Sequence, residues 1–203
     1  MDYRFKSKVW YAAAMGAASC ASYAIEKSPD WAATANAVIS AAIPSATSVR
    51  LRQRADLDSD GDTDVLLVLE RTDDALARNE PGALVIFLRN ERGTLEMAAT
   101  SPSAILCQTC GGAMGDPLQG ITPLRGGFVL RFEGGSRELW QRKHRFIYSP
   151  KANTWLPHAI SSKVLDRLDG NSEQSNIEST GLEPVPIEKF DSKEFMEDTI
   201  PDL

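Results

Sequence analysis

The pattern of apolar and polar residues along this chain predicts one short helix followed by a series of strands. Ser28 and Pro29 form a helix start. Apolar residues then recur at helical spacing up to Pro44, at Trp31, Ala35, Val38, Ile39 and Ala42. From Ser48 onward the chain shows alternation or short apolar runs, which are typical of strands. The clearest strand patterns are at 49–52, 65–69, 83–88, 128–133, 140–148 and 155–156.

These elements favour an antiparallel sheet over alternating strand–helix units, because turns of about four to twelve residues separate the strands and only one helix precedes them. We therefore expect a mainly β protein, as a sheet or a small sandwich or barrel. The chain of 203 residues is 42% hydrophobic, which suffices for an ordinary core. A helical lead-in is expected at 25–47, a β-rich domain at 48–166 and a tail at 167–203.

Between two of these strands, residues 56–64 read DLDSDGDTD, with aspartates at alternate positions. Like charges this close repel one another unless a cation neutralises them. Calcium takes about six to eight oxygen ligands, and a loop whose alternate residues point inward can supply them. The segment predicts a calcium site with the ligands Asp56, Asp58, Asp60, Asp62 and Asp64, of which Asp62 offers its backbone carbonyl.

The loop is not an EF-hand, because Leu67 occupies its twelfth position and no helix pattern flanks it. It resembles instead the strand–loop–strand calcium motif of FG-GAP and VCBS-type repeats, Asp-x-Asp-x-Asp-Gly-x-x-Asp, matched from Asp56 to Asp64. The motif occurs once, so it predicts a site and not a repeat architecture. A solvated acidic turn without metal is the alternative.

The first 24 residues resemble an export signal. Three basic residues in MDYRFKSK precede VWYAAAMGAASCASYA, a stretch without charge. Residues 17–20 resemble a lipobox, which implies lipidation of Cys20, whereas residues 22–24 suit an ordinary signal peptidase. A small-residue amphipathic helix on a cytoplasmic protein is the third interpretation. We expect a periplasmic protein or a membrane-anchored lipoprotein of the bacterial envelope.

Three cysteines are present, and Cys107 and Cys110 form the segment CQTCGG. If Cys20 leaves with the signal or carries a lipid, an oxidising periplasm can join the remaining pair. A disulfide is therefore expected. Two unpaired thiols, a half zinc site completed by His144 and His158, and a redox pair are the alternatives.

The tail is strongly acidic. From Asp169 to the end it contains ten acidic residues and two lysines, a net charge of −8, against −6 for the whole chain. This balance argues against generic nucleic-acid binding. The polar stretch 169–181 is expected to be mobile, and apolar residues farther on are expected to dock on the body: Val185, Ile187, Phe190, Phe195 and Ile200.

The chain contains no recognisable catalytic motif: no Gly-x-Ser-x-Gly, phosphate-binding loop or His-Glu-x-x-His occurs. A pair of carboxylates working as acid and base stays open as an alternative. The basic run from Arg142 to Arg145 is either a surface for an acidic partner or a set of charges that prevents strand addition at a sheet edge. We expect a protein that is not an enzyme.

The order of three features is similar to that of a family of bacterial envelope proteins. An Asp-rich loop precedes an apolar strand, a Cys-x-x-Cys-Gly-Gly and Gly-Asp-Pro stretch follows, and Gly134, Gly135 and Ser136 precede Trp140. Members of this family include immunity lipoproteins of bacterial-killing type IV secretion systems, whose β-rich domain resembles periplasmic lysozyme inhibitors. The similar region runs from about residue 48 to 158.

The resemblance implies a periplasmic inhibitor of a peptidoglycan-cleaving toxin, with calcium as a structural ion. For such a role the segment CGGAMGDPLQG suits contact with a protein, because a disulfide and Pro117 stiffen it while Gly115 and Asp116 can approach a partner. A structural turn that packs under the sheet is the alternative. A calcium-dependent adhesion or surface-binding module is the second functional class, because the aspartate loop alone suggests it.

Overall fold

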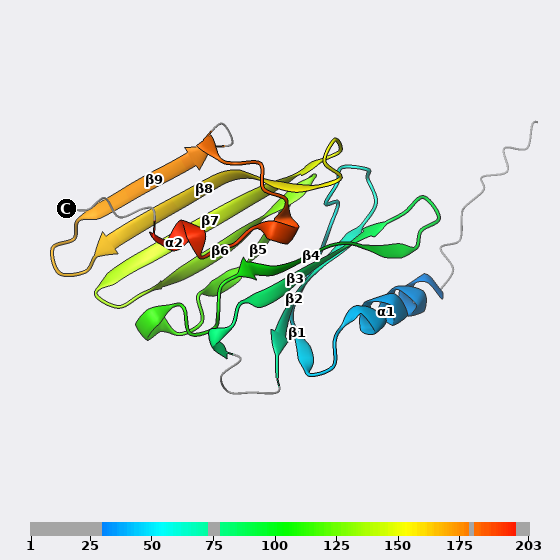
Figure 1. The fold of residues 1–203 in the computed structure, drawn as a ribbon, viewed down its shortest axis with the longest axis horizontal. Coiled ribbons are helices and arrows are strands. Elements are labelled where there is room, and N and C mark those ends of the chain that lie inside the picture. Colours follow the sequence, from blue (N-terminus) through cyan, green and yellow to red (C-terminus); the bar gives the residue numbers. More distant parts are fainter. Residues whose placement is uncertain (1–29, 73–77, 179–180, 198–203) are drawn as a thin grey trace, which may run out of the picture.

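Two antiparallel sheets face each other in the computed structural model, which describes residues 30–72, 78–178 and 181–197 (Figure 1). The first sheet runs in sequence order through β1 (Thr47–Ala55), β2 (Asp64–Arg71), β3 (Gly82–Arg89) and β4 (Leu95–Ile105). The mainly β, antiparallel and sandwich-like fold expected from the sequence is confirmed.

The second sheet is also a simple meander in sequence order. Its strands are β5 (Leu118–Leu124), β6 (Gly127–Gly135), β7 (Glu138–Ser149), β8 (Thr154–Asp166) and β9 (Ser172–Glu178). The two sheets do not close into a barrel. Consecutive strands joined by short turns can pair in this way without crossover connections.

The expected helix is α1 (Asp30–Ala42), which covers the outer face of the first sheet (Figure 1). Ile39 of α1 packs among side chains of β2 such as Val65 and Leu67. The alternate residues Leu66 and Val68 point to the other face, toward the second sheet. Because both faces of β2 are covered, its sequence is a continuous apolar run and does not alternate.

The main core lies between the sheets. Phe128, Leu130 and Phe132 of β6 are wholly buried there, which confirms the alternation seen in the sequence. Phe128 stacks on Phe146 of β7 with ring centroids 5.2 Å apart. Trp155 of β8 belongs to the same cluster and is also wholly buried.

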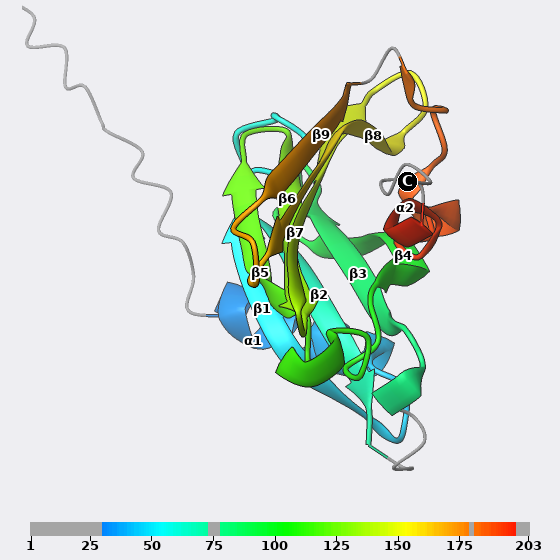
Figure 2. The ribbon, with the colours of Figure 1, turned by 90° about the vertical axis from the view of Figure 1, so that its left-hand side faces the viewer.

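Residues 181–197, which we call the C-terminal strap, close one side of the sandwich beside β4 (Figure 2). The strap contains η4 (Ile187–Lys189) and α2 (Glu194–Glu197). Ile187 and Phe190 reach the core, so the docking expected for this part of the tail is confirmed. Ser103 of β4 holds the strap: its Oγ donates to Phe190 O at 2.9 Å, and its carbonyl accepts from Ser192 N at 3.1 Å.

Two expectations about strands and surfaces are wrong. Most of the stretch expected to be mobile at 169–181 forms β9, which pairs with β8, because the polar sequence of Ser172–Glu178 suits the solvated edge of a sheet. The basic run lies on β7, an inner strand of the second sheet. Its alternate residues Arg142 and His144 point into the protein and are buried, so the run is neither an edge nor one continuous basic surface.

The export signal at 1–24, Cys20 and Ile200 lie outside the described residues. Within the part that the structure describes, no helix has the length and apolar character to cross a membrane.

Candidate metal centre

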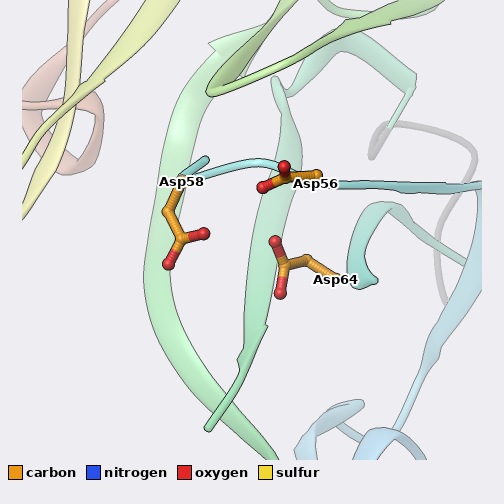
Figure 3. A group of neighbouring side chains, drawn as sticks. All are labelled: Asp56, Asp58 and Asp64. Carbon is orange, nitrogen blue, oxygen red and sulfur yellow. The ribbon is translucent and has the colours of Figure 1, made fainter. Parts of the chain in front are cut away.

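The aspartate loop is the hairpin connection between β1 and β2 (Figure 3). Ala55 and Asp64 pair across the base of this hairpin, so Asp56 and Asp64 enter the loop from its two ends. One carboxylate oxygen from each of Asp56, Asp58 and Asp64 lies within 4.8 Å of the others. The strand–loop–strand arrangement predicted from the sequence therefore gathers three of the five expected residues.

The other two aspartates shape the loop. Asp58 Oδ1 accepts a hydrogen bond from Asp60 N at 3.1 Å, and Asp60 Oδ1 accepts one from Asp62 N at 2.7 Å. Gly61 turns the chain with φ of +94°, a region that glycine enters without strain. Both Asp60 and Asp62 are exposed, and their carboxylates stand outside the three-residue group.

Asp64 is the buried member of the group, with no exposed surface. Its Oδ2 accepts from Leu57 N at 2.8 Å and its Oδ1 accepts from Arg89 N at 2.9 Å. Burial raises the pKa of this carboxyl to about 6, although the two backbone bonds act in the opposite direction. The backbone thus fixes the side chain in position, while burial disfavours its negatively charged form.

The surroundings of Asp58 and Asp56 are also unfavourable for negative charge. Burial raises the pKa of Asp58, and the Asp60 and Asp56 charges raise it further. Asp56 Oδ1 is buried and has no hydrogen-bond partner among the described residues. Its Oδ2 lies 3.7 Å from Nε of Arg125, a largely exposed side chain. A buried oxygen without a partner is costly, and a bound cation would satisfy it.

The donor set is chemically uniform. Three carboxylates offer hard, negatively charged oxygens, and this type of ligand suits calcium, magnesium or manganese better than zinc or copper. The residues present therefore fit a hard divalent cation.

The loop also joins the two sheets. Leu57, between two of the aspartates, is buried in the core, and its carbonyl accepts from Trp155 Nε1 of β8 at 2.8 Å. The Asp56 carbonyl accepts from Gly126 N, in the turn between β5 and β6, at 3.0 Å. Gly126 has φ of +73°, a region that favours glycine, and a Cβ atom here would also press against Ser59 Oγ. Sequence reasoning linked the loop to two strands of one sheet and missed its connection to the other.

The cysteine segment lies against the end of β6. The sulfur atoms of Cys107 and Cys110 are 2.02 Å apart, at bonding distance. Gly111 O accepts from Gly135 N of β6 at 2.9 Å. The expected partner-binding residues are largely used internally: Pro117 is buried, Asp116 pairs with Arg50 of β1, and Gly115 O accepts from Gly111 N at 2.8 Å. The exposed tip of the segment is instead 112–114.

A buried serine–histidine pair was not foreseen. Ser192 Oγ of the strap donates to Ala104 O at 2.6 Å and lies 3.2 Å from His144 Nδ1, so the imidazole donates to the hydroxyl. His144 Nε2 is buried without a partner among the described residues. Because Ser192 has no exposed surface and its proton is directed at the backbone, this pair lacks the access that a nucleophile needs. The burial of His144 could have been predicted from the sequence, because His144 and Phe146 are two positions apart and therefore point to the same face of the strand.

Comparisons of the chain with protein families, with characterised proteins and with solved structures find no match.

Proposed function

We propose that the hairpin loop binds one Ca²⁺ ion and that the ion ties the two sheets together. The observation that carries this proposal is the group of Asp56, Asp58 and Asp64, in which a buried Asp56 oxygen has no partner and the pKa of Asp64 is raised. A divalent cation would both bind the buried Asp56 oxygen and stabilise the charged form of Asp64. Calcium is favoured over magnesium because an irregular loop of carboxylate and carbonyl oxygens tolerates its flexible coordination.

The ion then acts as a structural staple. Asp56 and Asp58 flank Leu57, and Asp64 accepts a hydrogen bond from its N–H. The side chain and carbonyl of Leu57 contact the second sheet through the core and Trp155. Fixing the loop therefore fixes the position of one sheet on the other. We place function elsewhere on the surface, in binding to another protein.

We propose further that the protein is a non-enzymatic inhibitor in the bacterial envelope, directed at a peptidoglycan-cleaving toxin. Three features support this: the resemblance to immunity proteins, the export-like first 24 residues, and an exposed tip at 112–114 on a segment held by the cysteine pair and by Gly135. A short covalent loop loses little conformational entropy on binding, which suits an inhibitor.

Isothermal titration calorimetry tests the calcium proposal. Protein freed of metal with a chelator should take up one Ca²⁺ per chain, and Mg²⁺ should bind more weakly. Absence of calcium binding at millimolar concentration contradicts the proposal.

The inhibitor proposal needs a separate assay. If a cell-wall hydrolase is encoded beside its gene, the purified chain should block that enzyme at a near-equimolar ratio. If the hydrolase is unaffected and the chain binds glycan or a surface protein in a chelator-sensitive way, the adhesion module is the better assignment.

A further inference from the structure

A cavity of about 280 Å³ lies between the C-terminal strap and β8. Its apolar walls and its charged residues come almost wholly from the strap. The lining residues are Pro157, Gly181, Leu182, Glu183, Val185, Phe190, Asp191, Glu194 and Phe195. The volume is at or below the lower end for small-molecule sites, which suits one side chain of a partner better than a free ligand.

Two aromatic rings form part of the wall. Phe190 is buried, and Phe195 is half-buried and stacks on it with ring centroids 5.1 Å apart and an angle of 8° between the planes. A flat cationic group can lie against such a ring, since the face of an aromatic ring attracts positive charge.

Three carboxylates belong to the same cavity, and the lining residues include no lysine or arginine. Glu183 and Glu194 are exposed, whereas Asp191 is half-buried and its Oδ1 accepts from Lys193 N at 2.8 Å. The cavity therefore combines apolar walls with a net negative charge. An arginine side chain matches both, because it has an apolar stem and a planar guanidinium.

The cavity is preformed, because polar contacts on both sides hold the strap. Arg142 Nη1 of β7 donates to Phe195 O at 3.1 Å, and Ser192 bonds to both Ser103 and Ala104. Thr154 Oγ1 donates to the Glu188 carboxylate at 2.9 Å. A site held in this way loses little entropy when a side chain enters.

We propose that this cavity receives an arginine side chain from a basic protein partner. The inference rests on the part of the proposed function that assigns protein binding, and it names the chemistry of the partner. The arginine proposal does not depend on calcium binding, so an experiment can contradict either proposal without contradicting the other.

Titration of the ¹⁵N-labelled full chain with N-acetyl-arginine amide, followed by NMR, tests this proposal. Amide shifts should change at Leu182, Val185 and Phe195, with saturation, both with calcium and with chelator. N-acetyl-citrulline amide, which has the same shape without the charge, should bind about tenfold more weakly. Shifts that change elsewhere, or equal binding of the uncharged analogue, overturn the proposal.

Variants locate the binding. Glu183→Gln with Glu194→Gln should weaken arginine binding about tenfold through loss of charge. Phe195→Leu should weaken it while keeping the backbone carbonyl that Arg142 contacts. Glu173→Gln removes an exposed acid on β9 that does not line the cavity and should leave binding unchanged. If a chain ending at Glu197 binds the arginine probe and the full chain does not, the last residues of the chain occupy the cavity and the proposal fails.

Discussion

The indole Nε1 of Trp155 donates a hydrogen bond to the carbonyl oxygen of Leu57 at 2.8 Å, across 98 positions of sequence and between the two sheets. Both residues are buried in the main core. Since Leu57 lies between Asp56 and Asp58, the bond makes the geometry of the candidate metal loop depend on the second sheet.

Replacing Trp155 by phenylalanine should therefore destabilise the protein. The change leaves the Leu57 carbonyl buried without its donor, which costs about 1–3 kcal/mol of unfolding free energy. Urea denaturation measures the loss. Tyr148→Phe is the matched control. The Tyr148 ring lies beside Trp155, and the change removes only its exposed hydrogen bond to Asn153. An equal loss in both variants would contradict the role given to the indole.

Stability should depend on pH through His144. Burial, and next the Arg142 charge, lower the pKa of this imidazole to about 3 from 6.5. Between these pKa values the imidazole is protonated in the unfolded chain and neutral in the folded chain. The unfolding free energy therefore decreases as the pH falls from about 6.5 toward 3. The slope is about 1.4 kcal/mol per pH unit for one proton.

The difference between wild type and His144→Leu isolates this effect. Asp64 acts with the opposite sign in the calcium-free protein, because its raised pKa favours folding as the pH falls from about 6 to 3.8. Subtracting the unfolding free energies of the two proteins at each pH cancels that contribution. Below pH 6.5 the unfolding free energy of wild type should fall relative to that of His144→Leu. A difference that stays constant with pH would show that His144 does not titrate on unfolding.

Reduction of the Cys107–Cys110 pair should have a modest effect. A disulfide that closes so short a loop restricts the unfolded chain little, so its loss costs about 2 kcal/mol. Denaturation with and without a reducing agent measures this cost. Cys107→Ser with Cys110→Ser should be insensitive to the reductant, and complete unfolding of the reduced wild type would contradict the estimate.

Sequence reasoning succeeded where the local pattern and the burial agree. The alternation of Phe128, Leu130 and Phe132 identified β6, and the apolar run after Asp64 identified β2. The aspartate loop was singled out as a candidate metal site because its spacing is a local signal, and the structure brings Asp56, Asp58 and Asp64 together. The pattern could not show that Asp60 and Asp62 turn outward, since that depends on the hydrogen bonds within the folded loop.

The strands that were missed are edge strands: β4, β5 and β9. Pro102 in β4 and Pro123 in β5 weaken the strand pattern, and an edge strand tolerates proline because one side of its backbone needs no ladder bond. The contacts between Leu57 and Trp155 and between His144 and Ser192 join distant segments, so no local pattern predicts them.

The most direct test of the central claim compares thermal unfolding with and without calcium in wild type, Asp58→Asn and Asp62→Asn. Calcium at about 100 times its Kd should raise the wild-type Tm by about 5–10 °C. Asp62→Asn keeps its backbone carbonyl and should retain the response. Asp58→Asn keeps the oxygen that accepts from Asp60 N but loses a repelling charge, so its calcium-free Tm should equal or exceed that of wild type while the calcium response disappears. A wild-type Tm that ignores calcium, or an undiminished response in Asp58→Asn, would contradict the account.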